Sequence, residues 1–448
     1  MTLKPADTII SNLGAAKIDS PILKEANVDP ESDFTRDSDR VLINFDPDTV
    51  ATEMEEGDKP AGFEISGPRK NIYFDPSKVR CALVTCGGLC PGLNDIIRAI
   101  VLELYFRYGV RNIYGIRYGL QGFIPDYGHD IIELIPENVS DILNMGGSML
   151  GSSRGPQDIE KIVDSLERMN IGILFMIGGD GTLMAATLID DEITRRNLKI
   201  SVVGIPKTID NDIYLISRSF GFDTAVDVAT NAITGAHNEA EAYPNGIGLI
   251  KLMGRHSGFI AATAALARQD VNFALIPEID FDLYGDHGLL AALERRLRQR
   301  KHAVIVVAEG AGQKFFDDEQ TSRDASGNIR LKDIGLFLRD EINAYFDRKN
   351  IDISLKYIDP SYMIRSLPAN PNDSVFCGFL GRDAVHAGMA GKTRLLVGHW
   401  HDHFVHIPMA LSVGKRKHVD VHSKLWRTVL EATGQGTFRP NNGCMAPG

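Results

Sequence analysis

The apolar residues of the chain gather in short continuous runs, which alternate with longer stretches of helical periodicity. Runs of six or seven apolar residues are typical of strands buried on both faces of a parallel sheet, and the stretches between them predict helices that cross from one strand to the next. We therefore expect an α/β fold with doubly wound, Rossmann-like sheets. The predicted strands span residues 79–85, 171–177, 200–205, 246–252 and 303–308, and the predicted helices span residues 94–108, 157–169, 221–241, 257–268 and 288–300.

The first 65 residues differ from the rest of the chain in charge and in pattern. They hold 15 acidic and 6 basic residues, and so contribute −9 of the net charge of −11. Their weak periodicity predicts an extension with little core of its own, either draped over the body or solvated. The remaining residues are nearly neutral, which argues against general binding of nucleic acid or anionic membranes. Such a body can still hold a local cationic pocket for a small anionic metabolite.

Length and composition narrow the class of protein further. A chain of 448 residues, 44% of them hydrophobic, is long enough for two domains. None of its apolar runs approaches the roughly 18–20 residues of a membrane span, and its N-terminus lacks the pattern of a secretory signal. The five cysteines are few and odd in number, which favours a reducing compartment. We therefore expect a cytoplasmic protein that neither crosses a membrane nor binds nucleic acid.

Two glycine-rich loops follow predicted strands and carry candidate phosphate ligands. The first, TCGGLCPGLND, starts at Thr85 and leads into a helix. Its glycines let the backbone approach an oxyanion, although a tight turn alone would also need them. The second is GGDGT, residues 178–182, in which Asp180 stands at the end of a buried strand. A carboxylate there suits Mg²⁺ carried by a phosphate ligand, and a helix cap is the alternative.

A third loop, PKTIDND at residues 206–212, carries candidate acid–base chemistry. It places Asp210 and Asp212 beside the cation of Lys207 and the hydroxyl of Thr208. This set suits removal of a proton from an alcohol next to a phosphate, and an Asx-rich turn is the alternative. Open α/β sheets bind ligands where their strands end, so we expect Asp180 and Asp210 to face one common cleft. The chain has no GxxxxGK[ST] segment, which excludes a P-loop.

Eight ordered motifs give the chain a resemblance to the 6-phosphofructokinases, and more closely to their long plant-like and trypanosomatid-like ATP-dependent branch. They are CGGLCPGLND, GGSMLGSSRG, GGDGT, GIPKTIDND, SFGFDTAV, KLMGRHSGFIA, AEGAGQ and KYIDPSYMIR, and they lie between about residues 67 and 434. The resemblance implies two α/β lobes that exchange segments. Residues 76–220 with about 362–412 would bind the nucleotide, and residues 221–361 the sugar phosphate. An acidic N-terminal extension, 1–75, and a C-terminal segment, 413–448, would flank them.

The same resemblance implies a reaction and a set of site residues. ATP would phosphorylate the 1-hydroxyl of D-fructose 6-phosphate, with Asp210 as the base and Mg²⁺ held through Asp180. The implied ATP-binding residues are Gly88, Arg154, Gly155, Gly179, Asp180, Gly181 and Thr182. The implied sugar-phosphate residues are Thr208, Ile209, Asp210, Met253, Gly254, Arg255, Glu309, Tyr362, Met363, Ile364 and Arg365, with Lys356 assisting.

In the enzymes that the chain resembles, two positions affect whether ATP or pyrophosphate is the phosphoryl donor. A glycine at Gly181 leaves room for the α-phosphate of ATP, whereas an aspartate there would favour pyrophosphate. Lys207 is the residue type of pyrophosphate users. The combination resembles the plant and trypanosomatid ATP enzymes, and so we expect ATP. A pyrophosphate-dependent phosphofructokinase is the alternative, and a non-catalytic subunit that senses sugar phosphate is a remoter one.

Two further features set expectations about partners and surfaces. Gly246 stands where short bacterial enzymes of this resemblance carry an arginine that reaches a neighbouring subunit's sugar phosphate. We expect a homo-oligomer, a dimer or a tetramer, but not that shared contact. The basic run at residues 415–417 predicts a solvated face, and a site for an anionic effector is the alternative.

Overall fold

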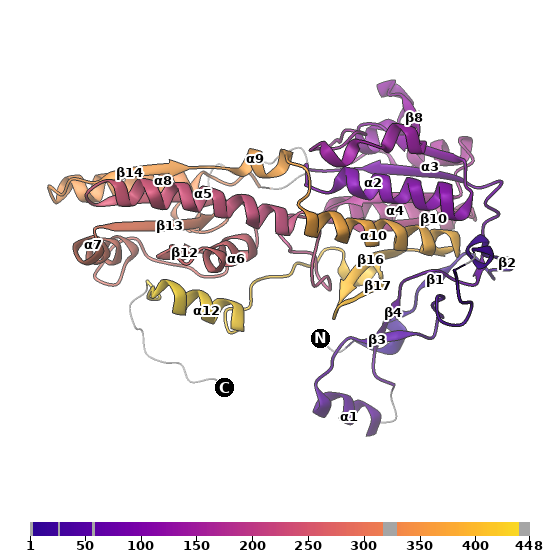
Figure 1. Cartoon of the computed structure of the whole chain (residues 1–448), viewed down its shortest axis with the longest axis horizontal. Helices are drawn as coiled ribbons and strands as arrows, with labels where there is room; N and C mark the ends of the chain where they lie inside the picture. The colour runs from indigo at the N-terminus through magenta and orange to yellow at the C-terminus, as the bar shows by residue number, and fades with distance from the viewer. Residues whose placement is uncertain (1–2, 26, 56–58, 317–328, 439–448) are drawn as a thin grey trace. The chain divides into compact units, whose positions relative to one another are not determined.

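The computed structural model describes residues 3–25, 27–55, 59–316 and 329–438. Within them the chain forms two compact units (Figure 1). The first unit comprises the residues up to Asp223 together with Arg365–Arg416. The second comprises the residues from Thr224 to Ile364 and those from Lys417 onward. The chain therefore leaves the first unit, builds most of the second and returns, so the two units exchange segments as the fold class predicts.

A nine-stranded sheet forms the centre of the first unit. Its five middle strands, β16, β10, β9, β6 and β7, are parallel, and antiparallel strands extend both edges. The buried faces of β6, β9 and β10 explain why these strands read as continuous apolar runs. In spatial order the strands are β3 (Arg40–Leu42), β4 (Gly62–Ile65), β17 (His403–Pro408), β16 (Leu395–Trp400), β10 (Ser201–Pro206), β9 (Ile173–Gly178), β6 (Arg80–Thr85), β7 (Asn112–Ile116) and β8 (Ile131–Glu133).

Helices cover both faces of this sheet. Leu174 of β9 lies in one core with Leu183 of α4 and Ile162 of α3. Ile173, on the opposite face, lies beside Gly388 of α10, where a methyl group would come within 2.8 Å of it. The helices of this unit are α2 (Leu93–Leu102), which continues as a π-helical turn (Glu103–Tyr108), α3 (Ile159–Arg168), α4 (Asp180–Arg195), α10 (Pro371–Met389) and the short α11 (Met409–Ser412).

The N-terminal extension lies against the body of the first unit through short strands. Strand β1 (Ser11–Asn12) pairs with β15 (Lys392–Thr393), and β2 (Ile18–Asp19) pairs with β5 (Asn71–Ile72). Strand β3 joins the large sheet through β4, which in turn pairs with β17. Of the two alternatives, the described residues show the draped extension. It also contains the short helices η1 (Pro5–Thr8), η2 (Pro21–Lys24) and α1 (Pro47–Glu55).

The second unit is built on a four-stranded parallel sheet. Its strands lie in the order β12 (Phe273–Leu275), β13 (His302–Ala308), β11 (Gly246–Leu252) and β14 (Ser354–Ile358). One core joins Ile247 and Ile305 of the sheet to Leu293 of α7 and Phe346 of α8. The helices of this part of the chain are α5 (Phe222–Ala242), α6 (Phe259–Ala267), α7 (Leu289–Arg300), α8 (Ile334–Arg348), α9 (Ser361–Ser366) and α12 (Lys424–Thr433).

The predicted fold class is confirmed, and so are the predicted elements. Each of the five predicted strands is present with ends within two residues of the prediction. All five predicted helices are also present, although the first changes to π geometry at Glu103. Over the residues that the structure describes, no helix has both the length and the apolar character needed to cross a bilayer.

Candidate active site

The three loops singled out in the sequence follow adjacent parallel strands of the first unit. In the register of the sheet Thr85 lies opposite Ile177, and Gly178 lies opposite Pro206, so β6, β9 and β10 end at the same edge. The chain runs from β6 to β7 on one side and then returns to β9 on the other. This reversal makes a topological switch point, where open α/β sheets bind their ligands.

The first loop is fixed to the segment that carries Arg154. The Thr85 hydroxyl lies 2.8 Å from the Ser148 hydroxyl, and the Ser152 hydroxyl donates to the Gly87 carbonyl at 2.6 Å. A methyl group at Gly88 would lie 3.5 Å from Nη2 of Arg154. The structure thus brings together Gly88 and the Arg154–Gly155 pair, two predicted parts of the nucleotide site that lie far apart in sequence.

The second loop begins helix α4 and leaves open space beside it. Asp180 is the first residue of α4, so its carboxylate lies at the positive end of the helix. Gly181 is exposed, and a methyl group placed there would meet no atom of the described residues within 4 Å. Thr182, by contrast, is buried against Gly178. The room at Gly181 is what a ligand larger than pyrophosphate would require.

Lys207, in the third loop, connects all three loops. Its backbone N–H donates to the Gly178 carbonyl at 2.9 Å, and its ammonium donates to the Gly88 carbonyl at 2.5 Å. Burial lowers the pKa of Lys207 below its ordinary value, and the positive charges of Arg365 and Arg154 act in the same direction. Arg154, Lys207 and Arg365 therefore place three cations at one edge of the sheet, where a polyphosphate could neutralise them.

The two aspartates of the third loop have different surroundings. Asp212 is buried and accepts a hydrogen bond from the Thr208 hydroxyl at 3.0 Å. The same hydroxyl accepts from the Asp210 N–H at 3.1 Å, which holds the loop in one shape. Asp210 is only partly buried.

Burial, together with the charges of Asp373 and Asp210, raises the pKa of the neighbouring Cys90 thiol to about 12, so that thiol is protonated at neutral pH.

Arg416 joins Asp180 to Asp212, although the sequence predicted a solvated basic face at this position. Its Nη1 lies 2.9 Å from Oδ2 of Asp212, and its Nη2 lies 3.9 Å from Oδ2 of Asp180. The backbone N–H of Gly414 donates to Asp180 at 3.1 Å. The solvated reading is therefore wrong for Arg416. No local pattern could have revealed this contact, because the arginine and Asp212 are 204 residues apart.

The carboxylates at this edge fit a magnesium ion. Mg²⁺ takes oxygen ligands and usually binds one or two carboxylates together with phosphate oxygens. Asp180 and Asp212 both lie within 4.0 Å of the guanidinium of Arg416, so a positive charge is already accommodated between them. The predicted ligand Asp180 thus has the chemistry that the ion requires.

The second unit brings together four of the predicted sugar-phosphate residues. Met253, Gly254 and Arg255 follow β11, and Glu309 follows the neighbouring β13. The two strand ends are tied by hydrogen bonds from the Glu309 N–H to the Leu252 carbonyl at 2.9 Å and from the Gly310 N–H to the Gly254 carbonyl at 3.1 Å. Arg255 and Glu309 therefore come from adjacent strand ends of one parallel sheet.

The residues predicted near the sugar phosphate differ in how their side chains lie. Helix α9 carries Tyr362 and Met363, which are exposed, and Ile364, which is buried. Ile209 and Met253 are also buried, so these three could contact a ligand only through the backbone. Lys356 lies apart from the other predicted sugar-phosphate residues of the second unit. It pairs with Gly248 in mid-strand, and its ammonium lies 5.3 Å from the centroid of the Tyr243 ring, which precedes β11.

Gly246 has a packing role that accounts for the missing arginine. A methyl group at this position would lie 2.0 Å from the carbonyl oxygen of Ala240, at the end of α5. No side chain fits there unless the helix moves. The absence of an arginine at this position therefore follows from the close approach of α5 to β11.

Comparison with known proteins decides the family. The model of the phosphofructokinase family matches residues 80–388, more than half of the chain. The chain belongs to the phosphofructokinase family. The match covers the three loops of the first unit and the strand ends of the second, as the resemblance of the motifs implied.

The chain is also similar to curated phosphofructokinases over most of its length. It is 50% identical to the ATP-dependent 6-phosphofructokinase of Borreliella burgdorferi, over 96% of this chain and 97% of that protein. It is 47% identical to ATP-dependent 6-phosphofructokinase 7 of Arabidopsis thaliana, over 86% of this chain and 79% of that protein. The crystal structure of the pyrophosphate-dependent phosphofructokinase from Marinobacter aquaeolei matches with a TM-score of 0.66 and 19% identity, over 80% of this chain and 91% of that one. The last match bears on the fold alone.

Proposed function

We propose that the chain is an ATP-dependent 6-phosphofructokinase, which transfers the γ-phosphoryl group of ATP to the 1-hydroxyl of D-fructose 6-phosphate. This proposal rests on one observation. Three cations and the carboxylates of two loops lie at the same edge of the sheet. Arg154, Lys207 and Arg365 supply the positive charge, and Asp180 and the Asp210–Asp212 loop supply a metal ligand and a base. The curated relatives, at 50% and 47% identity, carry the name of the same activity.

The nucleotide side of the reaction belongs to the loops of the first unit. Gly88, Gly155 and residues 179–182 bind the phosphates through backbone N–H groups, and Arg154 offers a planar fork to phosphoryl oxygens. Asp180 holds Mg²⁺, which neutralises the charge on the phosphate oxygens when it is bound. Lys207 is buried at 7% exposure, and so presents its charge without a water shell.

On the sugar side, Asp210 accepts the proton of the 1-hydroxyl. As it does so, a bond forms between that oxygen and the γ-phosphorus, and the bond from the γ-phosphorus to the oxygen bridging the β- and γ-phosphates breaks, so that ADP leaves. Met253, Gly254, Arg255 and Glu309 grip the sugar. Tyr362, Met363, Ile364 and Arg365 hold its 6-phosphate, while Thr208 and Ile209 position the loop of the base. The position of Lys356 in mid-strand does not support the predicted role of this residue in assisting with the sugar phosphate.

ATP is the donor because of the space beside Gly181. A methyl group there meets nothing within 4 Å in the described chain, so an α-phosphate can be accommodated. The test is an assay of fructose 1,6-bisphosphate formation with ATP or with pyrophosphate at equal concentration. We expect turnover with ATP. Turnover with pyrophosphate and none with ATP would overturn the proposal in favour of the pyrophosphate enzyme, and turnover with neither would favour a sensing subunit.

The role of Asp210 is tested by comparing two isosteric variants of neighbouring carboxylates. A positioned general base contributes about 10²–10⁴-fold, so Asp210→Asn should lower kcat by about that factor and change KM little. Asp212→Asn removes a carboxylate that holds the loop through Thr208 and Arg416. It should cost less in kcat and more in stability. Equal kcat for wild type and Asp210→Asn would remove the assignment of the base.

The remaining assignments concern organisation. We propose that residues 76–220 with 362–412 serve as the nucleotide lobe and residues 221–361 as the sugar-phosphate lobe. We also propose that the enzyme works as a homo-oligomer in the cytoplasm. Cys81, Cys86, Cys90 and Cys377 are buried free thiols, which suits a reducing compartment.

A further inference from the structure

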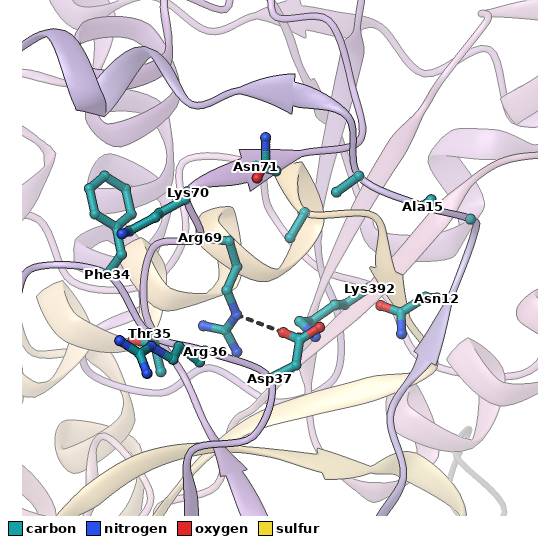
Figure 2. Close-up of a pocket in the computed structure, with 13 residues that line it drawn as sticks. Asn12, Ala15, Phe34, Thr35, Arg36, Asp37, Arg69, Lys70, Asn71 and Lys392 are labelled. Atoms are coloured by element: carbon teal, nitrogen blue, oxygen red, sulfur yellow. Dashed lines mark hydrogen bonds and ion pairs between the residues drawn. The ribbon is translucent and has the colours of Figure 1, made fainter. Parts of the chain in front are cut away.

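A cavity of about 500 Å³ lies where the N-terminal extension meets the body of the first unit (Figure 2). Asn12 and residues 14–16 and 34–37 of the extension line it, and residues 69–71, Ala390 and Lys392 complete its walls. The glycine loops contribute nothing to it, so it is separate from the candidate active site. Its size is within the range of cavities that hold small metabolites.

The charges around the cavity are mostly positive. Arg36, Arg69, Lys70 and Lys392 line it, against the single carboxylate of Asp37. Two of these cations are unusually well buried, since the side chains of Arg69 and Lys392 are 7% and 2% exposed. Lysine and arginine are almost never buried to this extent without a partner of opposite charge. The arrangement is notable because the extension as a whole is acidic.

The two buried cations share the same two carboxylates. Arg69 contacts Glu64 at 2.7 Å and Asp37 at 3.0 Å, and Lys392 contacts Glu64 at 2.8 Å and Asp37 at 2.9 Å. Glu64 is itself buried and also contacts His406 at 2.9 Å. Asp37 differs, because its side chain is 66% exposed; it lies directly beside Arg69 and Lys392 (Figure 2). One of the two carboxylates on the buried cations is therefore a surface group that solvent can reach.

The two cations at the rim of the cavity are paired with an exposed carboxylate. Arg36 and Lys70 at the rim lie 3.9 Å and 2.7 Å from the carboxylate of Glu31, which is exposed. Within 4.0 Å the four cations thus pair with three carboxylates, Glu31, Asp37 and Glu64. Asp29 acts on Lys70, and Asp383 acts on Arg69, from farther away. Two of the three are exposed and can be exchanged for a ligand without leaving a buried charge unpaired.

We propose that this cavity binds a small metabolite through its phosphate group. The phosphate is received by Arg36, Arg69, Lys70 and Lys392 and takes the place of the Asp37 carboxylate. Arginine forks and lysine ammonium groups are the usual partners of phosphate oxygens. The rest of the ligand lies against the ring of Phe34 and the amides of Asn12 and Asn71. Since the lining residues come from both the extension and the body, a bound ligand also fastens one to the other.

Direct binding to the full-length chain tests the proposal. The probes are inorganic phosphate and glycerol 3-phosphate, measured by isothermal titration calorimetry and by the melting temperature. Glycerol, and sodium chloride at matched ionic strength, are the blanks. We expect saturable binding of at least one phosphate probe, and a rise in melting temperature that the blanks do not reproduce. No saturable binding, or a rise equal to that in sodium chloride, would overturn the proposal.

Surface variants locate the site without disturbing the buried pairs. Arg36→Ala combined with Lys70→Ala should weaken phosphate binding at least tenfold and leave kcat unchanged. Lys78→Ala is the matched control, because Lys78 is also a lysine paired with a surface carboxylate, 3.2 Å from Asp75, but does not line the cavity. Binding that is unchanged in the double variant would show that the phosphate binds elsewhere and would overturn the proposal.

A third variant tests the exchange of Asp37 for the ligand. Asp37→Asn removes the competing carboxylate, so it should lower the melting temperature without phosphate and tighten phosphate binding several-fold. Added phosphate should then restore more of the melting temperature in this variant than in the wild type. Weaker binding in Asp37→Asn would contradict the exchange.

Discussion

Replacing Arg416 with alanine should damage catalysis by releasing the loop that carries the base. The guanidinium of Arg416 is the group that holds Asp212 from outside the loop, at 2.9 Å, while Thr208 holds it from within. Asp212 is buried, so its carboxylate cannot exchange the arginine for bulk water. Loss of the guanidinium should therefore shift the loop, and Asp210 with it.

The contacts of Arg416 give the size of the effect. A hydrogen bond to a charged group contributes about 1.5–3 kcal/mol, and the pair with Asp212 belongs in this range, because one partner is 8% exposed and the other 32%. The pair with Asp180 is longer, at 3.9 Å, and both side chains are about one-third exposed. Such a pair contributes less than about 1 kcal/mol. The contact with Asp212 thus dominates, and a loss of about 2 kcal/mol corresponds to roughly 30-fold in kcat/KM.

Steady-state kinetics with a coupled assay for fructose 1,6-bisphosphate measure this loss. Arg416→Ala should lower kcat/KM about 10- to 100-fold, and Arg416→Lys, which keeps the charge but not the fork, should recover part of it. Lys415→Ala is the control for charge alone, because its ammonium lies 5.4 Å from the centroid of the Tyr214 ring. If Arg416→Ala keeps the wild-type kcat/KM and the wild-type stability, the reasoning from its geometry is refuted.

Two further predictions follow from the space beside Gly181 and from the burial of Glu103. An aspartate at 181 suits the first turn of a helix, so Gly181→Asp should melt close to the wild type. Its charge, about 5 Å from a phosphate at an effective dielectric of about 20, would cost about 3 kcal/mol in binding of that phosphate. This cost should lower kcat/KM for ATP about 100-fold, and steady-state rates with ATP test it. Burial raises the pKa of Glu103 from 4.5 to about 7, so the folded state binds this proton more tightly than the unfolded state, and stability is lost as pH rises from about 4.5 to 7. Glu103→Gln should thus raise the free energy of unfolding by about 1–3 kcal/mol at pH 8 and far less at pH 5, and urea unfolding that gives equal gains at both values would contradict this.

The central strands could be predicted from the sequence because both of their faces are buried. Runs such as residues 171–177 contain few polar residues that could signal another structure, and their order along the chain implies parallel pairing. The edges of the sheet were harder to predict. Strands β3 and β4 have only three and four residues, and β4, which joins β3 to the sheet, pairs with β17, a segment more than 300 residues away. The short strands of the extension could not be predicted from the sequence for the same reason.

The candidate site could be predicted as far as its parts follow strand ends. Asp180 and Lys207 directly follow β9 and β10, so the topology of the sheet alone brings them together. Arg416 follows no strand of the parallel set, and its neighbours in sequence are lysines, so nothing local distinguished it from a solvated charge. The register with Gly248 that places Lys356 in mid-strand could be known only once β14 was paired with β11.

The order in which the strands are made has a consequence for biosynthesis. Strand β10 ends at Pro206, and its partner β16 begins at Leu395, so all the strands of the second unit leave the ribosome before the first sheet can be completed. At about 5–20 residues per second, the open edge of β10 waits roughly 10–40 s for its partner. A hydrophobic edge exposed for that time is prone to pair with other nascent chains. Soluble yield during overexpression should therefore depend strongly on temperature and on chaperones that cover the emerging chain.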